Sequence, residues 1–230
     1  MTELVNLSPI KEDKEEINLR KREIHPLFPT LVFSSVVDNK KFLSETAKKI
    51  MALTKKEGTG DRAGNLGWYS KHDMHMLPEF EDLHDLVLKE MVMVFDYYMI
   101  NYDSVYITSM WANVGYRPEY CHQNHIHPNS MFSGVLHISI PPNGQGTAFA
   151  DPRPAARVIE PDHMEHGPNN AGAVIPKHEE GQLFIFPSFL PHGVHSSTES
   201  YGKGNNRITV SFNAMMTGEI TNRTAPLILK

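Results

Sequence analysis

The sequence predicts a mainly β protein with N-terminal helices, in which two helices pack on a C-terminal jelly roll. Two observations carry this prediction. Apolar residues recur with helical spacing in two segments of the first hundred residues, whereas from about Tyr102 the hydrophobic pattern has a period of two. Several short strand-like segments then follow one another, with Gly, Pro and Asn between them and no helical pattern, which favours an antiparallel sandwich or barrel.

The composition is that of a folded domain. The chain of 230 residues is long enough to bury a full core, and its 40% hydrophobic and 21% charged residues are ordinary globular values. We expect a charged N-terminal arm at 1–24 and a single domain at 25–230. The net charge of -5 and the pI near 6.2 argue against a face that binds nucleic acid.

The same composition bears on localisation. The apolar runs are too short to cross a bilayer, and no secretory signal precedes the first strand. The chain has one cysteine, Cys121, which excludes an intrachain disulfide and fits a reducing compartment. We therefore expect a cytoplasmic protein with no membrane partner.

The N-terminal elements follow from local patterns. The segment HPLFPTLVFSSVV predicts a first strand. Its two prolines confine it to a sheet edge or stand at its start, and such an edge strand would allow a homodimer. Helices are predicted at 39–57 and at 78–100, the second with Pro78 at its start. The second helix carries one apolar stripe, made of Phe80, Leu83, Val87, Met91, Val94 and Tyr98. The Gly-rich segment between the helices is expected to be a loop.

The jelly-roll core is expected at about 102–216. Its strand-like segments are SVYITSMWANV, MFSGVLHISI, GTAFAD, GQLFIFPS and RITVSFNAMM. A stretch of low periodicity at 154–180 interrupts them. Loops of that length in a compact domain are usually functional or disordered, and we expect this one to be a lid over a site.

Histidines are concentrated in CHQNHIHPNSMFSG, just before an apolar strand. If the backbone there is extended, the side chains of His125 and His127 leave the same face and can converge on one ion. Two solvated loop histidines would give the same pattern. His192 in FPSFLPHGV favours the metal site, because two strands of one jelly roll can bring it beside the pair. Three ligands on one face, with open positions opposite, are typical of non-haem iron oxygenases.

Arg207 opens the strand RITVSFN, on which residues 207, 209, 211 and 213 share a face. A buried arginine is costly unless it pairs with an anion, and a guanidinium matches a carboxylate with two parallel hydrogen bonds. A side chain that snorkels outwards would fit the pattern equally well.

Taken in order, four motifs resemble the 2-oxoglutarate- and Fe(II)-dependent oxygenase superfamily, in particular a branch marked by HxHxxSxxSG, FxDPR, FPSxLPHGV and RIxxSFN. They are WANVGYRPEYCHQNHIHPNSMFSGVLHISIPP, GTAFADPR, GQLFIFPSFLPHGV and RITVSFN, and the resemblance is strong from Trp111 to Asn213. It implies a double-stranded β-helix with Fe(II) at its open end. It also implies a dioxygenase that uses O2 and 2-oxoglutarate, releases succinate and CO2, and hydroxylates a protein side chain or a small molecule.

The resemblance implies a ligand set with one departure. In the superfamily the first motif is H-x-D or H-x-E; here His125 matches the first ligand and His192 the distal one, but the second position is His127. Two ligand sets are open. In the first, which the spacing of the motif favours, all three histidines bind the metal. In the second, Asp151 from AFADPR is a ligand, and one histidine of the HxH pair instead orients a ligand through a hydrogen bond. Asp151 before Pro152 would also suit a turn.

For the cosubstrate, Arg207 matches the basic residue that pairs with the far carboxylate of 2-oxoglutarate. His137 falls where related prolyl hydroxylases often carry a tyrosine that binds the same carboxylate, and an imidazole can supply that donor if its tautomer or charge permits. Thr209 faces the same interior, and Asn113 is a weaker candidate for this pocket.

Two functions of other classes stay open at this point. One is a cupin-like metal-binding module without redox chemistry, because fold alone does not choose between functions. The other is a three-histidine dioxygenase that does not use 2-oxoglutarate, in which Arg207 would bind a carboxylate of the substrate itself.

Overall fold

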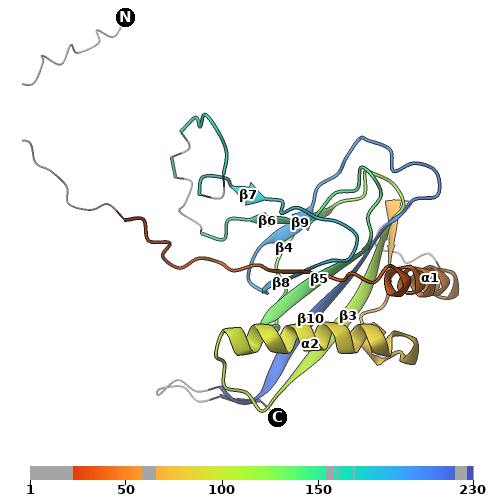
Figure 1. Ribbon diagram of the computed structural model, residues 1–230, viewed down its shortest axis with the longest axis horizontal. Coiled ribbons are helices and arrows are strands. Elements are labelled where there is room, and N and C mark those ends of the chain that lie inside the picture. Colours follow the sequence, from red (N-terminus) through yellow and green to blue (C-terminus); the bar gives the residue numbers. More distant parts are fainter. Residues whose placement is uncertain are drawn as a thin grey trace, which may run out of the picture.

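The computed structural model describes residues 23–58, 66–153, 158–159, 161–167, 169–220 and 227–229. Two antiparallel sheets and two helices make up this part of the chain (Figure 1). The predicted mainly β jelly roll with N-terminal helices is therefore confirmed. The arm predicted at 1–24 lies almost wholly outside the described residues, so its separation from a domain at 25–230 stays a prediction.

The elements have the following bounds. The helices are α1 (Lys40–Glu57) and α2 (Glu81–Tyr97). The strands of the larger sheet are β1 (Phe33–Val36), β2 (Gly67–Tyr69), β3 (Ser104–Gly115), β5 (Phe132–Ser139), β8 (Gln182–Pro187), β10 (Arg207–Ile220) and β11 (Leu227–Leu229). Those of the smaller sheet are β4 (His122–His125), β6 (Ala148–Ala150), β7 (Ala173–Val174) and β9 (His192–Val194).

The larger sheet has the order β1–β8–β5–β10–β3–β2, with β11 also paired to β10, and the smaller sheet has the order β4–β9–β6–β7. The first strand lies at a sheet edge, as its prolines predict, and pairs only with β8 along this order. In the smaller sheet, β9 lies between β4 and β6. This arrangement brings the HxH segment, the LPHGV segment and the end of the FADPR strand together.

The central strand β10 separates a core from a cavity. Its side chains alternate between the two faces of the sheet, as they do on any strand. On one face, apolar residues join the core shared with the helices: Ile208, Val210, Phe212 and Ala214. On the other face, polar residues line a cavity between the sheets: Arg207, Thr209, Ser211 and Asn213. The face shared by residues 207 to 213, predicted from the period of two, is therefore the face of the site.

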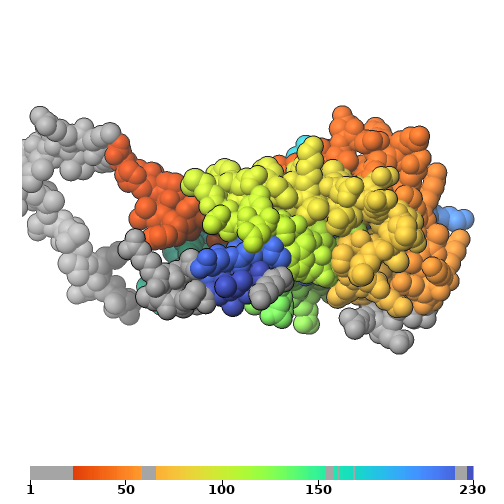
Figure 2. All heavy atoms as spheres, turned by 90° about the horizontal axis from the view of Figure 1, so that it is seen from below, coloured from red at the N-terminus to blue at the C-terminus, as the bar shows by residue number. Residues whose placement is uncertain are grey.

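The two helices cover the outer face of the larger sheet. In Figure 2 the yellow and yellow-green atoms of the α2 region span this face, with the orange atoms of the α1 region beside them. The α1 helix begins after Asn39, whose side chain accepts a hydrogen bond from the Phe42 backbone N at 3.0 Å, and it ends at Gly58. The stripe predicted for α2 is buried from Phe80 to Val94, whereas Tyr98 is 36% exposed.

Four details differ from the predictions. Residues 78–80 form a 3₁₀ turn, and α2 ends at Tyr97 instead of residue 100. The predicted loop between the helices contains β2, and the predicted lid contains β7. These strands have three and two residues, too few for a period to be detected. No helix within the described residues is long and apolar enough to pass through a membrane.

Candidate metal and cosubstrate site

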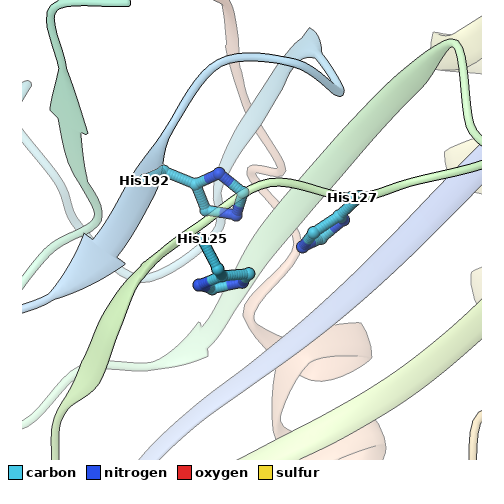
Figure 3. Close-up of side chains that lie close together, drawn as sticks. All are labelled: His125, His127 and His192. Carbon is cyan, nitrogen blue, oxygen red and sulfur yellow. The ribbon is translucent and has the colours of Figure 1, made fainter.

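Three histidine side chains converge at the place where β4 and β9 meet. His125 and His192 are direct partners in the antiparallel β4–β9 pair, and His127 follows two residues after β4 ends. The ring centroids are 4.5 Å apart for His125 and His192, 4.8 Å for His127 and His192, and 5.1 Å for His125 and His127. Figure 3 shows the three rings around one common space. Their potential ligand nitrogens all lie within 4.8 Å of one another.

The extended backbone that would place both residues of the HxH pair on one face is present only as far as His125. The strand stops at His125, and His127 lies in the following segment, where its backbone N donates to the Ser188 carbonyl at 3.0 Å. The two side chains still converge, because this hydrogen bond holds the segment against the residues just after β8.

Each of the three imidazoles has its Nδ1 bound to an oxygen that can only accept. His125 Nδ1 donates to the Gln123 carbonyl at 2.8 Å, and His192 Nδ1 donates to the Leu190 carbonyl at 2.9 Å. His127 Nδ1 donates to the Asn213 side-chain oxygen Oδ1 at 2.6 Å. Since Nδ1 carries the proton in all three rings, the lone pair is on Nε2 and is available to a metal.

Burial favours the neutral form that a metal requires. Desolvation lowers the pKa of His192 to about 4, and burial also lowers the pKa of His127. A ligating imidazole must be unprotonated, so both rings are ready to bind a metal at neutral pH without first losing a proton.

The three histidines form part of the wall of a cavity of about 710 Å³ between the sheets. A volume of this size is typical of small-molecule sites. The wall includes the Trp111 indole, which stacks with His72 at 4.6 Å between ring centroids and lies 5.5 Å from His127. Among the described residues that line the cavity there is no aspartate or glutamate.

Arg207 is a buried cation at the wall of this cavity. Its side chain is 1% exposed, its Nε donates to the Gln145 carbonyl at 2.7 Å, and its Nη1 lies 3.5 Å from Thr209 Oγ1. Its Nη2 is buried and has no hydrogen-bond partner among the described residues. Burial lowers the pKa of Arg207, but a guanidinium stays charged in a protein. The outward snorkelling that the sequence left open is therefore excluded.

Thr209 and Asn113 lie next to Arg207, as predicted. They are register partners on β10 and β3, and Asn113 Nδ2 donates to Thr209 Oγ1 at 3.4 Å and to Ser211 Oγ at 3.0 Å. The Asn113 oxygen Oδ1 is buried without a partner. The cavity wall thus holds an unpaired donor on Arg207 and an unpaired acceptor on Asn113.

His137 is a correction to the prediction. It is fully buried, and its Nδ1 donates to the Gln182 carbonyl at 3.1 Å, which leaves Nε2 as an acceptor, 3.5 Å from Thr147 Oγ1. Desolvation lowers its pKa to about 3, so the ring does not gain a second proton near neutral pH. His137 is also not part of the cavity wall, where Thr147 takes its place. It therefore does not donate directly to a ligand in the cavity.

Asp151 directly follows β6, which pairs antiparallel with β9 through Phe149 and His192. Its carboxylate accepts two hydrogen bonds from the Arg153 guanidinium, from Nε at 2.9 Å and from Nη2 at 2.6 Å. The group of described His, Cys, Asp and Glu residues that could hold a metal contains the three histidines and not Asp151.

Sequence reasoning set aside His122, which the structure brings into the site. His122 lines the cavity, and its Nε2 lies 2.6 Å from the Tyr69 hydroxyl and 2.5 Å from the Tyr120 hydroxyl. Desolvation lowers its pKa to about 3. Tyr69 comes from the short strand β2, and nothing in the sequence pattern ties that strand to the HxH segment.

The residues present fit both implied cofactors. Three imidazoles on one side of a cavity, each with Nδ1 bound to an oxygen and Nε2 left for a metal, suit Fe(II), because imidazole is a common ligand of that ion. The unpaired Nη2 of Arg207 suits a carboxylate, because it gives the buried charge the partner that it lacks. Fold and site together define an Fe(II)- and 2-oxoglutarate-dependent oxygenase.

Comparison with known proteins gives the same class. Residues 109–213 match the family described as "Putative 2OG-Fe(II) oxygenase". This segment includes all three histidines and Arg207. No curated protein sequence matches the chain.

Solved structures of low sequence identity share the fold. They include HygX from Streptomyces hygroscopicus with nickel, 2-oxoglutarate and hygromycin B bound (12% identity, TM-score 0.57, covering 82% of this chain and 84% of that one). A prolyl-4-hydroxylase from Pseudomonas putida has 11% identity and a TM-score of 0.54, with 82% and 94% covered. The α-ketoglutarate-dependent epimerase SnoN from nogalamycin biosynthesis has 13% identity and a TM-score of 0.58, with 82% and 78% covered.

Proposed function

We propose that the protein hydroxylates a C–H bond of a protein side chain or a small molecule, consuming O2 and 2-oxoglutarate and releasing succinate and CO2. One observation carries this proposal: three imidazoles whose Nδ1 atoms are bound to oxygens, and one buried guanidinium whose Nη2 has no hydrogen-bond partner among the described residues, line the same cavity. A metal site alone needs the histidines only. The additional unpaired cation supports a second ligand that carries a carboxylate.

In this proposal, Nε2 of His125, His127 and His192 would hold Fe(II), and the adjoining cavity would receive the cosubstrate and O2. Arg207 receives the far carboxylate of 2-oxoglutarate, with Thr209 and Asn113 beside it. The bound iron, with 2-oxoglutarate and O2, supplies the oxidising power for C–H cleavage. The chain holds the reactants in place, and the apolar side chains of the cavity wall exclude water: Trp111, Val135, Phe186 and Val194.

The direct test is anaerobic addition of 2-oxoglutarate to the Fe(II)-loaded protein. Chelation of iron by a 2-oxo acid gives a visible metal-to-ligand charge-transfer band, which we expect in the wild type and which Arg207→Ala should lose. Metal binding without this band would support the cupin-like module instead. O2 consumption without succinate release would support a dioxygenase that does not use 2-oxoglutarate.

A second test addresses the ligand set, which we propose as His125, His127 and His192. In His127→Ala, the iron content of the purified protein should collapse, because one of three ligands is lost. Asp151→Asn removes the charge of the alternative ligand at nearly constant size and should leave the iron content unchanged. Iron content that is retained in His127→Ala and lost in Asp151→Asn would make Asp151 the third ligand.

The proposal also includes a localisation, a lid and an oligomeric state. We place the protein in the cytoplasm, which its single cysteine supports. The segment 154–180 lies between β6 and β8, strands on either side of the site, which supports a lid role for it. The edge strand β1 supports a homodimer through its unpaired side.

A further inference from the structure

The three candidate ligands are oriented in two different ways. The Nδ1 atoms of His125 and His192 each bind a backbone carbonyl two residues earlier, Gln123 and Leu190, so these rings are set by their own segments. His127 has no such local partner for Nδ1. Its ring is held by the side chain of Asn213, 86 residues further along the chain.

The Asn213 side-chain amide has a partner on each of its atoms. Oδ1 accepts from His127 Nδ1 at 2.6 Å and from Ser133 Oγ at 2.8 Å, and Nδ2 donates to Ser109 Oγ at 3.0 Å. Ser133 Oγ is in turn 2.7 Å from Ser188 Oγ, and both serines are buried. In this network the Asn213 amide is oriented with Oδ1 towards His127 and Nδ2 towards Ser109.

That orientation decides which nitrogen of His127 is free. Because Oδ1 can only accept, it fixes the proton on Nδ1 and leaves the Nε2 lone pair for a metal. If Nδ2 faced the ring instead, Nδ1 would have to accept, and the proton would sit on Nε2. The Asn213 amide therefore favours the tautomer of His127 that can bind a metal through Nε2.

The network also joins the sequence motifs that carry the resemblance. His127 and Ser133 come from HxHxxSxxSG, Ser188 from FPSxLPHGV and Asn213 from RIxxSFN. We propose that Asn213 is a positioning residue that makes His127 the third metal ligand, with Ser133 and Ser188 holding its amide in place. This inference rests on the proposed ligand set.

The test measures Co(II) binding to the metal-free protein by calorimetry and by the visible spectrum of the bound Co(II), which reports its ligands. Asn213→Leu keeps the approximate shape and removes the acceptor. We expect it to weaken Co(II) binding about 10–100-fold. Its Co(II) spectrum should move towards that of His127→Ala.

Asn213→Asp is the matched conservative variant. Its carboxylate still accepts from His127 and Ser133, and the Ser109 hydroxyl can rotate to donate to the second oxygen. We expect this variant to restore Co(II) binding to within about threefold of the wild type. Thr108→Ala is the control, because Thr108 Oγ1 donates to the Asn213 backbone carbonyl at 3.3 Å and does not touch the amide. It should bind Co(II) as the wild type does.

A double-mutant cycle separates positioning from general damage. If Asn213 acts only through His127, Asn213→Leu has no further effect on Co(II) affinity in the His127→Ala background. Losses that simply add would overturn the proposal. If Asn213→Leu does not fold, Ser133→Ala serves instead, and it should weaken Co(II) binding in the same direction by a smaller factor.

The outcomes also distinguish this inference from the proposed function. A wild-type protein that binds no Co(II) would refute the three-histidine site itself. A wild type that binds Co(II) through His127, with Asn213→Leu and Ser133→Ala both unchanged, would refute only the role of Asn213.

Discussion

His125 and His192 face each other across the β4–β9 pair, with their ring centroids 4.5 Å apart. The next residue of β9, Gly193, makes this close approach possible. A Cβ atom at this position would lie 2.6 Å from the His122 carbonyl oxygen and 2.8 Å from Asn124 Oδ1. The spacing of two proposed ligands thus depends on a residue without a side chain.

Gly193→Ala should therefore force β4 and β9 apart. We expect Ni(II) affinity to fall by about tenfold, because the two rings can no longer share one ion at the same spacing. Overpacking should also lower the free energy of unfolding by about 1–3 kcal/mol. Calorimetric titration with Ni(II) and urea unfolding measure the two effects.

Gly167→Ala is the control for this substitution. A Cβ atom at Gly167 meets no atom of the described residues within 4 Å, so both quantities should stay at their wild-type values. Unchanged Ni(II) affinity in Gly193→Ala would show that the β4–β9 spacing does not determine metal binding.

The sequence was sufficient for the parts of the site that follow from strand periodicity. His125, His192 and Arg207 could be placed because side chains alternate on a strand and because neighbouring jelly-roll strands bring known positions together. The same period put residues 207 to 213 on one face, which is the face of the cavity. These positions follow from the backbone alone and do not depend on any side-chain contact.

Roles that depend on distant hydrogen bonds could not be predicted in the same way. The tautomer of His137 is set by the Gln182 carbonyl, 45 residues away, and that tautomer excludes the donor role expected for it. His122 could not be linked to Tyr69, since β2 has only three residues. Arg153, in contrast, lies two residues after Asp151 within FADPR. The sequence alone could therefore have indicated that Arg153 competes with a metal for the Asp151 carboxylate.

Packing around Tyr120 gives a further prediction. Its ring lies on two facing glycines, Gly67 and Gly115, where added Cβ atoms would be 2.3 Å and 2.8 Å from ring carbons. Gly115→Ala should displace the ring and separate its hydroxyl from His122, with a loss of about 1–3 kcal/mol in the free energy of unfolding. Urea unfolding tests this.

The background of Tyr120→Ala checks the cause of that loss. Without the ring, the two shortest of these contacts disappear and the Cβ of residue 120 remains at 3.4 Å, an ordinary van der Waals distance, so Gly115→Ala should then cost much less. An equal cost in both backgrounds would mean that the alanine strains the backbone and not the contact with Tyr120.

The low pKa of His137 predicts a loss of stability in acid. Its pKa is about 3 in the folded protein and 6.5 when unperturbed. Above pH 6.5 the ring is neutral in both states, and its contribution to stability is fully present. Below pH 6.5 the unfolded chain binds a proton that the folded protein does not, so stability falls by about 1.4 kcal/mol per pH unit until about pH 3.

His137→Gln removes this titration and leaves the other histidines in place. The free energy of unfolding of the wild type minus that of the variant should therefore shrink by about 1.4 kcal/mol per unit as the pH is lowered from 6 to 5. Urea unfolding at several pH values gives this difference. A difference that does not change with pH would show that His137 titrates alike in both states.

Arg207 should stabilise the bound cosubstrate at the expense of the ligand-free protein. Its Nη2 is buried without a partner, so the charge is desolvated and only partly compensated until an anion binds. Arg207→Met fills a similar volume without charge, and we expect a ligand-free protein that is as stable as the wild type or more stable by up to about 2 kcal/mol.

The same variant should bind 2-oxoglutarate about 100-fold more weakly in the presence of Ni(II), because the carboxylate loses its partner. Arg207→Lys, which keeps the charge but not the planar donor pair, should fall between the two. Marked destabilisation of ligand-free Arg207→Met, with unchanged 2-oxoglutarate affinity by calorimetry, would show that Arg207 is a structural cation and not the carboxylate site.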